Sequence, residues 1–472
     1  MPIAPLAHVN ASSKPLNVVL IVIDTLRAKK LSCYGHSRPT SPNIDRLARE
    51  GVLFENHFAT GCWTLPSHAS MFTGMYPFSH RADIEHPYLD TAYPTWAEIA
   101  TALKCRAAAF NPNNWIRVSQ ADRGFGLYDE CRKPPGYRAG TRFTAERFAQ
   151  WLATYRGDEA PFFAFLNFGD PHLRCWPLEE NRRRFLLEGA TEEEAAAIDQ
   201  KPTRSTAGLA RLTERQWAIL ESLNDGCVAD ADERVGFVRQ TLEAEGLLDD
   251  TLLIVTSDHG DIYHEHPPQM AHTMNVYDCC IHVPLVVRLP GVFEGGKRVV
   301  SLTQNTDYLP TWLGLAGVEL EGALASIQGK SLIDALEGET RAFAFAEDPC
   351  PWNELERFER MPGARDLRRF HRLLRTARTH EWKYIYSSNG ADELYRIAED
   401  KDEQTNRIDE RPDVARQLFE AMDSWLAEMP TRAAPGLVNT APGKPATFAS
   451  ASRMARWRGA IARFGESEGA LS

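Results

Sequence analysis

Four short apolar runs along the chain have the pattern of strands that are buried on both faces of a sheet. They cover residues 17–24, 162–168, 251–255 and 283–289, and polar, proline or glycine residues close each run. Continuous apolar runs of this length are typical of parallel strands that helices cover on both sides. The pattern therefore predicts a mostly parallel sheet.

Helical patterns lie between these runs, at residues 144–155 and 214–245. Strands that alternate with helices predict an α/β fold, in which a large sheet is flanked by helices. We assign residues 1–370 to this large domain and expect it to carry the catalytic residues.

Shorter elements follow in residues 371–430. Residues 375–386 alternate like one strand exposed on one face, and residues 392–396 form a second short strand after a Ser-Asn-Gly turn. Residues 411–426 have a helical pattern. The sequence therefore predicts a small C-terminal antiparallel sheet with a helix.

The last part of the chain, residues 431–472, has a different composition. It begins with a linker rich in alanine, proline and threonine, and continues with apolar residues at helical spacing among arginines: Met454, Trp457, Ile461 and Phe464. This spacing predicts a basic amphipathic tail helix. We expect the helix to pack on this subunit or on a second copy, as in a homo-oligomer; the alternative is a basic lid over an anionic substrate.

Composition narrows the classes of partner. The 472 residues are 43% hydrophobic and carry a formal net charge of −11, which argues against general nucleic-acid binding. No apolar run approaches the roughly 18 residues of a membrane span. The nine cysteines show no paired metal spacing, so we interpret them as free thiols and expect a cytoplasmic protein with no membrane or nucleic-acid partner.

Polar residues that can bind a metal follow three of the predicted strands. Asp24 ends the first run, His172 comes shortly after the second, and Asp258 and His259 follow the third. Because the carboxyl ends of parallel strands meet at one edge of a sheet, one site can gather all of them. The carboxylates and the imidazole suit Mn, Zn, Mg or Ca, and the sequence leaves the choice open.

Thr64 opens a further predicted helix. A hydroxyl group that is bound to a divalent cation loses its proton more easily and becomes a nucleophile, and the amides of a helix N-terminus can hold an anion. We therefore predict one divalent cation bound by Asp24, Thr64, Asp258 and His259, with Thr64 as the catalytic nucleophile.

Several motifs resemble the sulfatase branch of the alkaline phosphatase superfamily. Residues 17–27 resemble its opening strand, residues 64–74 its Cys/Ser-x-Pro-Ser-Arg signature, and residues 256–260 its second metal strand. Residues 277–291 and 381–395 are similar to later stretches of the same family. The resemblance implies the alkaline-phosphatase/sulfatase-like fold, hydrolysis of a small anionic ester and a metal cofactor.

Three residues depart from the sulfatase pattern. Thr25 replaces the second aspartate, Thr64 replaces the cysteine or serine that becomes formylglycine, and His68 replaces an arginine. Cys62 lacks the proline two residues later that the maturation signal needs, so formylglycine is not expected. The remaining set resembles part of the metal site of phosphotransferases and phosphodiesterases, whose threonine is transiently phosphorylated.

The threonine also bears on the chemistry. Formylglycine hydrate releases a sulfated intermediate by elimination, whereas a threonine ester must be cleared by attack on the central atom, which is more natural for phosphorus. We therefore predict a phosphate or phosphonate ester hydrolase with a phosphothreonine intermediate; a transferase results if an alcohol replaces water. The alternatives are a sulfatase that works without formylglycine and a degenerate, non-catalytic binding protein.

Further site residues follow from the resemblance. His172 matches a histidine that reaches the ester oxygens, and His272 lies where sulfatases use a substrate-binding lysine, although His266 competes for this place. We assign His172 and His272 to catalysis. Asn113, in a predicted site loop, and His68, in place of the lost arginine, are assigned to substrate binding.

Two further interpretations stay open at this stage. Lys29 and Lys30 could supply local positive charge, and Asp170, His172 and His272 could bind a second ion. In this family the walls of the substrate pocket come from variable insertions, which here correspond to residues 110–140, 173–215 and 350–370.

Overall fold

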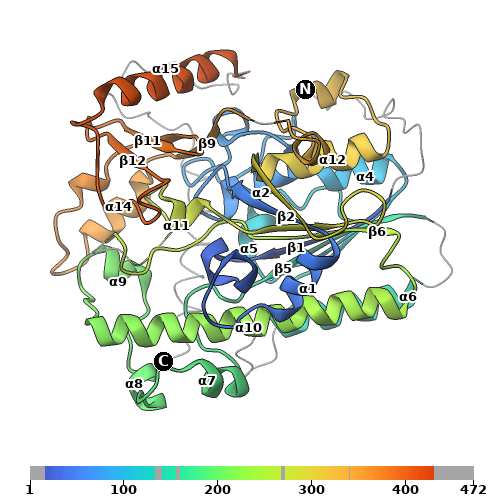
Figure 1. Cartoon of the computed structure of the whole chain (residues 1–472), viewed down its shortest axis with the longest axis horizontal. Helices are drawn as coiled ribbons and strands as arrows, with labels where there is room; N and C mark the ends of the chain where they lie inside the picture. The colour runs from blue at the N-terminus through green and yellow to red at the C-terminus, as the bar shows by residue number, and fades with distance from the viewer. Residues whose placement is uncertain are drawn as a thin grey trace. The chain divides into compact units, whose positions relative to one another are not determined.

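The computed structural model describes residues 16–132, 141–155, 160–266, 270, 272–339 and 341–429. Its centre is an eight-stranded sheet with the strand order β4-β3-β5-β1-β6-β7-β2-β8 (Figure 1). The strands are β1 (Asn17–Ile23), β2 (Val52–Phe58), β3 (Arg106–Phe110), β4 (Leu127–Asp129), β5 (Phe162–Phe168), β6 (Thr251–Thr256), β7 (Leu285–Arg288) and β8 (Lys297–Gln304).

The large sheet is mostly parallel, as the sequence predicts. Strand β1 pairs in parallel with β5 on one side and with β6 on the other. Strand β7, part of the predicted run at residues 283–289, runs antiparallel to both of its neighbours, β6 and β2. It does so because the chain leaves the carboxyl end of β6, forms the short helix α11 (Asp278–Ile281) and re-enters the sheet at the same edge.

Two helical layers cover the sheet, because alternate residues of its central strand enter two separate cores. Side chains of β1 enter one core at Val18, Leu20 and Val22, and the other at Val19, Ile21 and Ile23. The first core contains α2 (Thr64–Thr73), α4 (Trp96–Ala102) and α12 (Tyr308–Leu315), and the second contains α1 (Pro42–Glu50), α6 (Thr141–Thr154) and α10 (Glu214–Ala244) (Figure 1). Helices α6 and α10 confirm the two helical patterns that the sequence shows.

A second, four-stranded antiparallel sheet has the order β12-β11-β10-β9. It consists of β9 (Ala344–Asp348), β10 (Leu374–Arg378), β11 (Trp382–Ser387) and β12 (Glu393–Arg396), and α15 (Pro412–Glu428) packs on it through Val414, Leu418 and Met422. The small sheet and its helix are confirmed.

Two details of the small sheet differ from the sequence expectation. The prediction of a single strand at residues 375–386 is wrong. These residues form a hairpin of β10 and β11, which is closed by a hydrogen bond from the Thr379 amide to the Trp382 carbonyl. Alternation continues across this turn, so the pattern alone does not reveal it. The fourth strand, β9, lies before residue 371. The expected tail helix lies outside the described residues.

The remaining helices are short. They are α3 (Pro77–His80), α5 (Asn114–Val118), α7 (Glu179–Phe185), α8 (Glu192–Ala196), α9 (Pro202–Thr206), α13 (Leu332–Leu336) and α14 (Trp352–Glu359). In the described ranges, no helix has the length and apolarity that crossing a bilayer requires.

The topology brings the ends of three strands together. In the parallel register, Ile23 of β1 lies opposite Phe168 of β5, and Val22 lies opposite Thr256 of β6. The amide of Asp24 continues this pairing by donating a 2.8 Å hydrogen bond to the Phe168 carbonyl. The residues that follow these strands therefore leave the sheet side by side.

Candidate functional site

Asp24, Asp258 and His259 form a buried cluster at these strand ends. One ligand atom from each lies within 4.8 Å of the others, and the Nε2 atom of His259 is 3.3 Å from Asp258 Oδ2 and 3.8 Å from Asp24 Oδ1. These same three atoms are buried and lack a hydrogen-bond partner among the described residues. Buried carboxylate oxygens without a partner are unfavourable, and a divalent cation among the three atoms would satisfy all of them.

The protonation of the cluster also suits a cation. Burial, together with the neighbouring Asp258 carboxylate, raises the pKa of Asp24 to about 6, and burial raises the pKa of Asp258 to about 6. Burial also holds the pKa of His259 well below its ordinary value. His259 donates from Nδ1 to the Gly260 carbonyl at 2.9 Å, so the lone pair of Nε2 faces the two carboxylates, as metal ligation requires.

Thr25, which stands where the family has a second aspartate, contributes through its backbone. Its φ of 60° places a β-branched residue in the left-handed region, which is a strained conformation. In this conformation the Thr25 amide donates a 3.2 Å hydrogen bond to Asp258 Oδ1. The residue therefore orients one of the candidate ligands instead of adding a carboxylate.

Thr64 is the first residue of α2. The start of this helix is hydrogen-bonded to the segment after β6 that carries Asp258. The Ser67 hydroxyl donates a 2.6 Å hydrogen bond to the carbonyl of Asp258, and Asn305 Nδ2 donates to Ser67 Oγ at 2.9 Å. Sequence reasoning missed Ser67 and Asn305, because their partners are distant in the sequence. Their effect is to fix the position of Thr64 relative to Asp258.

Asn113 connects the nucleophile candidate to a candidate ligand. Its Nδ2 atom lies 3.1 Å from Asp24 Oδ2 and 3.5 Å from Thr64 Oγ1. Its Oδ1 atom accepts a 3.0 Å hydrogen bond from the Trp115 amide and so caps α5. The structure thus brings Asn113 into the site, with its amide group between Asp24 and Thr64.

His68 lies behind Thr64, one helical turn further along α2. Its Nδ1 atom donates to the Thr64 carbonyl at 2.8 Å, and its Nε2 atom is 3.4 Å from Nδ2 of Asn167, which can donate to it. The ring is fully buried and packs edge-on against Phe165, and burial lowers its pKa to about 4. His68 is therefore a neutral residue that supports Thr64 from the interior. The only sequence signal for Asn167 was a polar residue within an apolar strand.

His272 lies beside the cluster. Its ring centroid is 4.4 Å from that of His259 and 5.5 Å from that of His172. Its Nδ1 atom is 3.4 Å from Oδ1 of Asp261, a buried carboxylate that sequence reasoning missed although it follows the Asp-His-Gly motif directly. The Asp261 carboxylate therefore lies beside the His272 ring, but neither of these two atoms has a hydrogen-bond partner among the described residues.

His172 faces the same group of charges. It donates from Nδ1 to the Leu173 carbonyl at 2.7 Å. Burial would lower the pKa of His172, but the carboxylates of Asp24 and Asp261 outweigh it and hold this pKa above its ordinary value. The structure therefore brings both predicted catalytic histidines to the site.

Two of the open sequence interpretations lose support. His266 stacks on Tyr277 with the ring centroids 3.6 Å apart, so His272, and not His266, lies against the cluster. For the second ion, no other group of three potential ligands within the described ranges lies as close together as the first.

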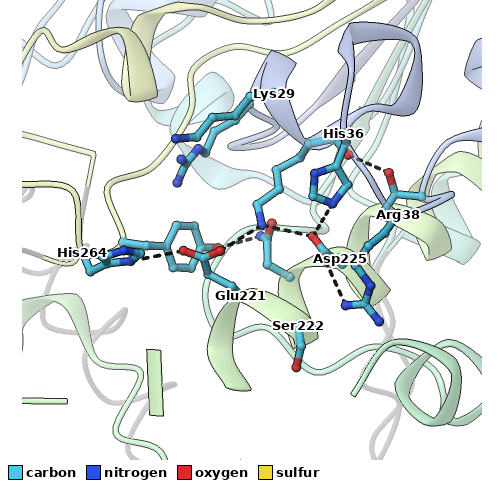
Figure 2. Close-up of polar contacts among 12 residues, drawn as sticks. Lys29, His36, Arg38, Glu221, Ser222, Asp225 and His264 are labelled. Atoms are coloured by element: carbon cyan, nitrogen blue, oxygen red, sulfur yellow. Dashed lines mark hydrogen bonds and ion pairs between the residues drawn. The ribbon is translucent and has the colours of Figure 1, made fainter. Parts of the chain in front are cut away.

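Lys29 and Lys30 pair with carboxylates of other segments. Lys29 contacts Glu265 at 2.9 Å and Asp402 at 2.8 Å, whereas the buried Lys30 contacts Asp225 at 3.0 Å. Figure 2 shows that Asp225 is also contacted by His36 and Arg38. These ion pairs neutralise the two lysines, so neither supplies free positive charge to the metal cluster.

Fold and site together identify an ester hydrolase of the sulfatase-like branch of the alkaline phosphatase superfamily. The chain belongs to the sulfatase family: the family described as Sulfatase matches residues 16–318. The family described as "N-sulphoglucosamine sulphohydrolase, C-terminal" matches residues 273–430.

Individual relatives are distant but cover most of the chain. Arylsulfatase K of Bos taurus is 25% identical over 461 residues, which is 87% of this chain and 81% of the relative. The N-acetylglucosamine-6-O-sulfatase of Bacteroides thetaiotaomicron is 23% identical over 84% of this chain and 83% of its own length. The crystal structure of a phosphonate monoester hydrolase of Agrobacterium radiobacter is similar with a TM-score of 0.70, 24% identity, and coverage of 88% and 96% of the two chains.

Proposed function

We propose that this sulfatase-family hydrolase cleaves phosphate or phosphonate esters, with Thr64 as a nucleophile that is transiently phosphorylated. The observation that carries the proposal is the position of the Asn113 amide group, 3.1 Å from Asp24 and 3.5 Å from the Thr64 hydroxyl. It joins the hydroxyl to a cluster of three ligand atoms that have no hydrogen-bond partner in the described part of the chain. Cys62 is fully buried, and burial raises the pKa of its thiol well above the ordinary value, which supports a route without formylglycine.

A divalent cation held by Asp24, Asp258 and His259 would act as a Lewis acid, which favours the ionised hydroxyl and offsets negative charge on the ester oxygens. Asn113 holds the Thr64 hydroxyl in place, while His68 fixes the first turn of α2 from the interior. An anion bound at the start of α2 would accept hydrogen bonds from backbone amides of the first turn, as at other helix N-termini. Preorganised donors of this kind stabilise the charge that develops in the transition state.

The reaction then proceeds in two displacements. Thr64 Oγ1 releases its proton to solvent and forms a bond to phosphorus as the bond to the alcohol oxygen breaks, and His272 or His172 donates a proton to the departing oxygen. Water then attacks phosphorus and gives a proton to the same histidine, while the bond from phosphorus to Oγ1 breaks and Oγ1 takes up a proton from solvent, which restores the threonine. If an alcohol replaces water in this step, the enzyme is a transferase. Added glycerol or ethanol distinguishes a hydrolase, which releases the free acid, from a transferase, which forms a new ester of the added alcohol.

A sulfatase that works through unmodified Thr64 is the second candidate. The names of the sequence relatives favour it, since two of them are an arylsulfatase and an N-acetylglucosamine-6-O-sulfatase. The name of the structurally similar phosphonate monoester hydrolase supports the first candidate, because a fold of this kind accommodates phosphonate esters.

The deciding experiment compares 4-nitrophenyl phosphate, a 4-nitrophenyl phosphonate monoester, bis(4-nitrophenyl) phosphate and 4-nitrophenyl sulfate, each with Mn, Zn, Mg and Ca. We expect turnover of the phosphorus esters, phosphate on Thr64 in mass spectra of acid-quenched enzyme, and loss of turnover in Thr64→Ala with retention of metal. Thr64→Ser should keep part of the activity. Turnover confined to the sulfate ester would sink the phosphorus proposal, and turnover of none by any form would favour a binding protein.

The setting of the enzyme is also proposed. All nine cysteines are free thiols, which supports the expectation of a reducing, cytoplasmic compartment. The partner that we propose is a small anionic ester, with neither nucleic acid nor membrane, and a homo-oligomer can be tested by light scattering.

A further inference from the structure

The segment of residues 350–372 packs on the loop that carries His272. Met274, two residues after this histidine, shares a buried apolar cluster with Leu355, Phe358, Leu367 and Phe370. Burial raises the pKa of Glu354 on α14, and the proximity of Arg357 and His272 opposes this rise. Both observations place the segment next to His272.

The same segment is joined to the turn after α9. The amide of Arg365 donates a 3.0 Å hydrogen bond to the carbonyl of Ala207, and Figure 1 shows α14 and α9 on the same side of the molecule. At Gly208, whose φ is +73°, a Cβ atom would lie 3.0 Å from Cδ of Arg365. Glycine therefore leaves room for the aliphatic part of the Arg365 side chain. At this point two of the segments that we predict to form the pocket walls, residues 173–215 and 350–370, meet.

Three arginines at this junction have no acidic partner among the described residues. Arg360 pairs with Glu356, and Arg368 pairs with Asp366. Arg211, Arg365 and Arg369, in contrast, make no ion pair with any residue that the structure describes. Unpaired positive charge is notable in a chain whose formal net charge is −11.

Arg365 is the most unusual of the three. Its Nε and Nη2 atoms are buried and have no hydrogen-bond partner among the described residues, and its guanidinium lies 5.7 Å from the centre of the Phe370 ring. Burial and the charges of Arg369 and Arg211 lower its pKa to about 10. A guanidinium presents a rigid fork of N–H donors that matches the oxygens of a phosphate, sulfate or carboxylate. The unused donors of Arg365 therefore make it a candidate partner for such a group.

We propose that Arg365, together with Arg211 and Arg369, binds a second oxyanion of the substrate. The enzyme then acts on esters that carry a phosphate, sulfate or carboxylate group in addition to the ester at Thr64. This inference rests on the proposed function, since it places the reacting ester at the metal cluster. It narrows the substrate class to compounds with two anionic groups, one bound at the metal cluster and the other at the three arginines.

Paired sugar phosphates test the proposal at two spacings: glucose 6-phosphate against glucose 1,6-bisphosphate, and trehalose 6-phosphate against its 6,6′-bisphosphate. Binding is measured by calorimetry on full-length, Mn-loaded Thr64→Ala enzyme, so that turnover plays no part. We expect the bisphosphate of at least one pair to bind about tenfold more tightly, as one added charge-assisted contact implies. Arg365→Gln and Arg369→Gln should each reduce this preference to less than about twofold.

Arg360→Gln is the matched control, because Arg360 lies in the same segment but is exposed and paired with Glu356. Equal affinity for both members of both pairs, or the same loss of preference in Arg360→Gln, would overturn the proposal. Arg365→Gln should keep or raise the melting temperature in phosphate-free buffer, because it removes a half-buried charge that has no acidic partner among the described residues. A lower melting temperature would assign Arg365 a structural role instead. In that case Arg369→Gln, at an exposed position, still tests whether the arginines bind a second oxyanion. If the preference is found but no ester is turned over, the subsite stands and the proposed function fails.

Discussion

The Nδ1 atom of His68 lies 2.8 Å from the carbonyl oxygen of Thr64 and links the interior of the sheet to the nucleophile candidate. His68→Ala would remove this contact and the contact of Nε2 with Nδ2 of Asn167, and would open a cavity beside Phe165. We expect it to reduce the free energy of unfolding by about 2–4 kcal/mol. Turnover should fall by about 10- to 100-fold, since the position of Thr64 is loosened. Urea titration and kcat measure the two effects.

The control for His68 is the exposed His380, whose alanine variant should match the unmodified enzyme in both measurements. Unchanged turnover in a destabilised His68→Ala enzyme would show that this histidine serves packing alone.

Asn113→Asp separates the two roles of Asn113. The aspartate keeps an oxygen that can cap α5, so the melting temperature should change little. It replaces the amide donor between Asp24 and Thr64 by a carboxylate, so kcat/KM should fall by about 100-fold. Asn113→Ala loses the cap as well, and its additional destabilisation should be about 1 kcal/mol. Equal activity of the unmodified enzyme and the Asn113→Asp variant would contradict a positioning role.

Metal removal should lower stability, because it leaves Asp24, Asp258 and His259 with buried, unpartnered ligand atoms. At a free cation concentration of about 100 times Kd, restoring the metal should add about 3 kcal/mol to the free energy of unfolding. Thermal unfolding of chelator-treated enzyme with and without added cation measures this difference. Asp24→Asn should abolish the response, whereas Asp249→Asn, at an exposed position, should retain it. A melting temperature that ignores the cation in the unmodified enzyme would contradict this metal site.

The sequence predicted the arrangement of the backbone better than the contacts between side chains. The apolar runs of β1, β5 and β6 predicted the sheet, and the convergence of its strand ends placed Asp24 near Asp258 and His259. These inferences succeed because burial on both faces leaves a continuous apolar pattern, and parallel strands share one direction.

Contacts between side chains could not be predicted in the same way. Asn167 meets His68 across 99 positions of sequence, and Asp261 meets His272 through a loop whose course no periodic pattern records. Strand β9 was missed for a related reason, since it has only five residues and pairs with β10, which begins 26 positions after the end of β9. Such pairs depend on tertiary packing and not on local preference.

His272 and His266 should respond differently to substitution. His272→Gln should slow esters of poorly acidic alcohols, such as methyl esters, by about 100-fold or more, and should slow 4-nitrophenyl esters much less, because a good leaving group needs no proton. His266 stacks on Tyr277, so His266→Gln should show no dependence on the leaving group. Rates across a series of leaving groups give this comparison. A uniform loss across the series in His272→Gln would assign the residue to binding instead of proton donation.

Asp225 should be one of the strongest electrostatic supports of the turn that follows Asp24. Its carboxylate lies 3.0 Å from Lys30, 3.1 Å from His36 and 3.0 Å from Arg38 (Figure 2). Asp225→Ala would leave Lys30 buried without its closest partner, and we expect a loss of about 3–5 kcal/mol in the free energy of unfolding at pH 7. Asp249→Ala removes a carboxylate from an exposed ion pair and should cost less than about 1 kcal/mol.

The pH dependence of Asp225 gives a second test with a defined sign. Burial alone would raise the pKa of this carboxyl, but His36 and Lys30 outweigh it and lower the pKa from 3.8 to about 2. The folded state therefore binds this proton less readily than the unfolded state, so the contribution is complete above pH 3.8 and is lost as the pH falls toward 2. Urea titrations of the unmodified enzyme and of Asp225→Asn should differ by about 2 kcal/mol or more at pH 7, with a gap that narrows below about pH 4. A gap that stays constant between pH 7 and pH 3 would show that the carboxylate is not held ionised by these cations.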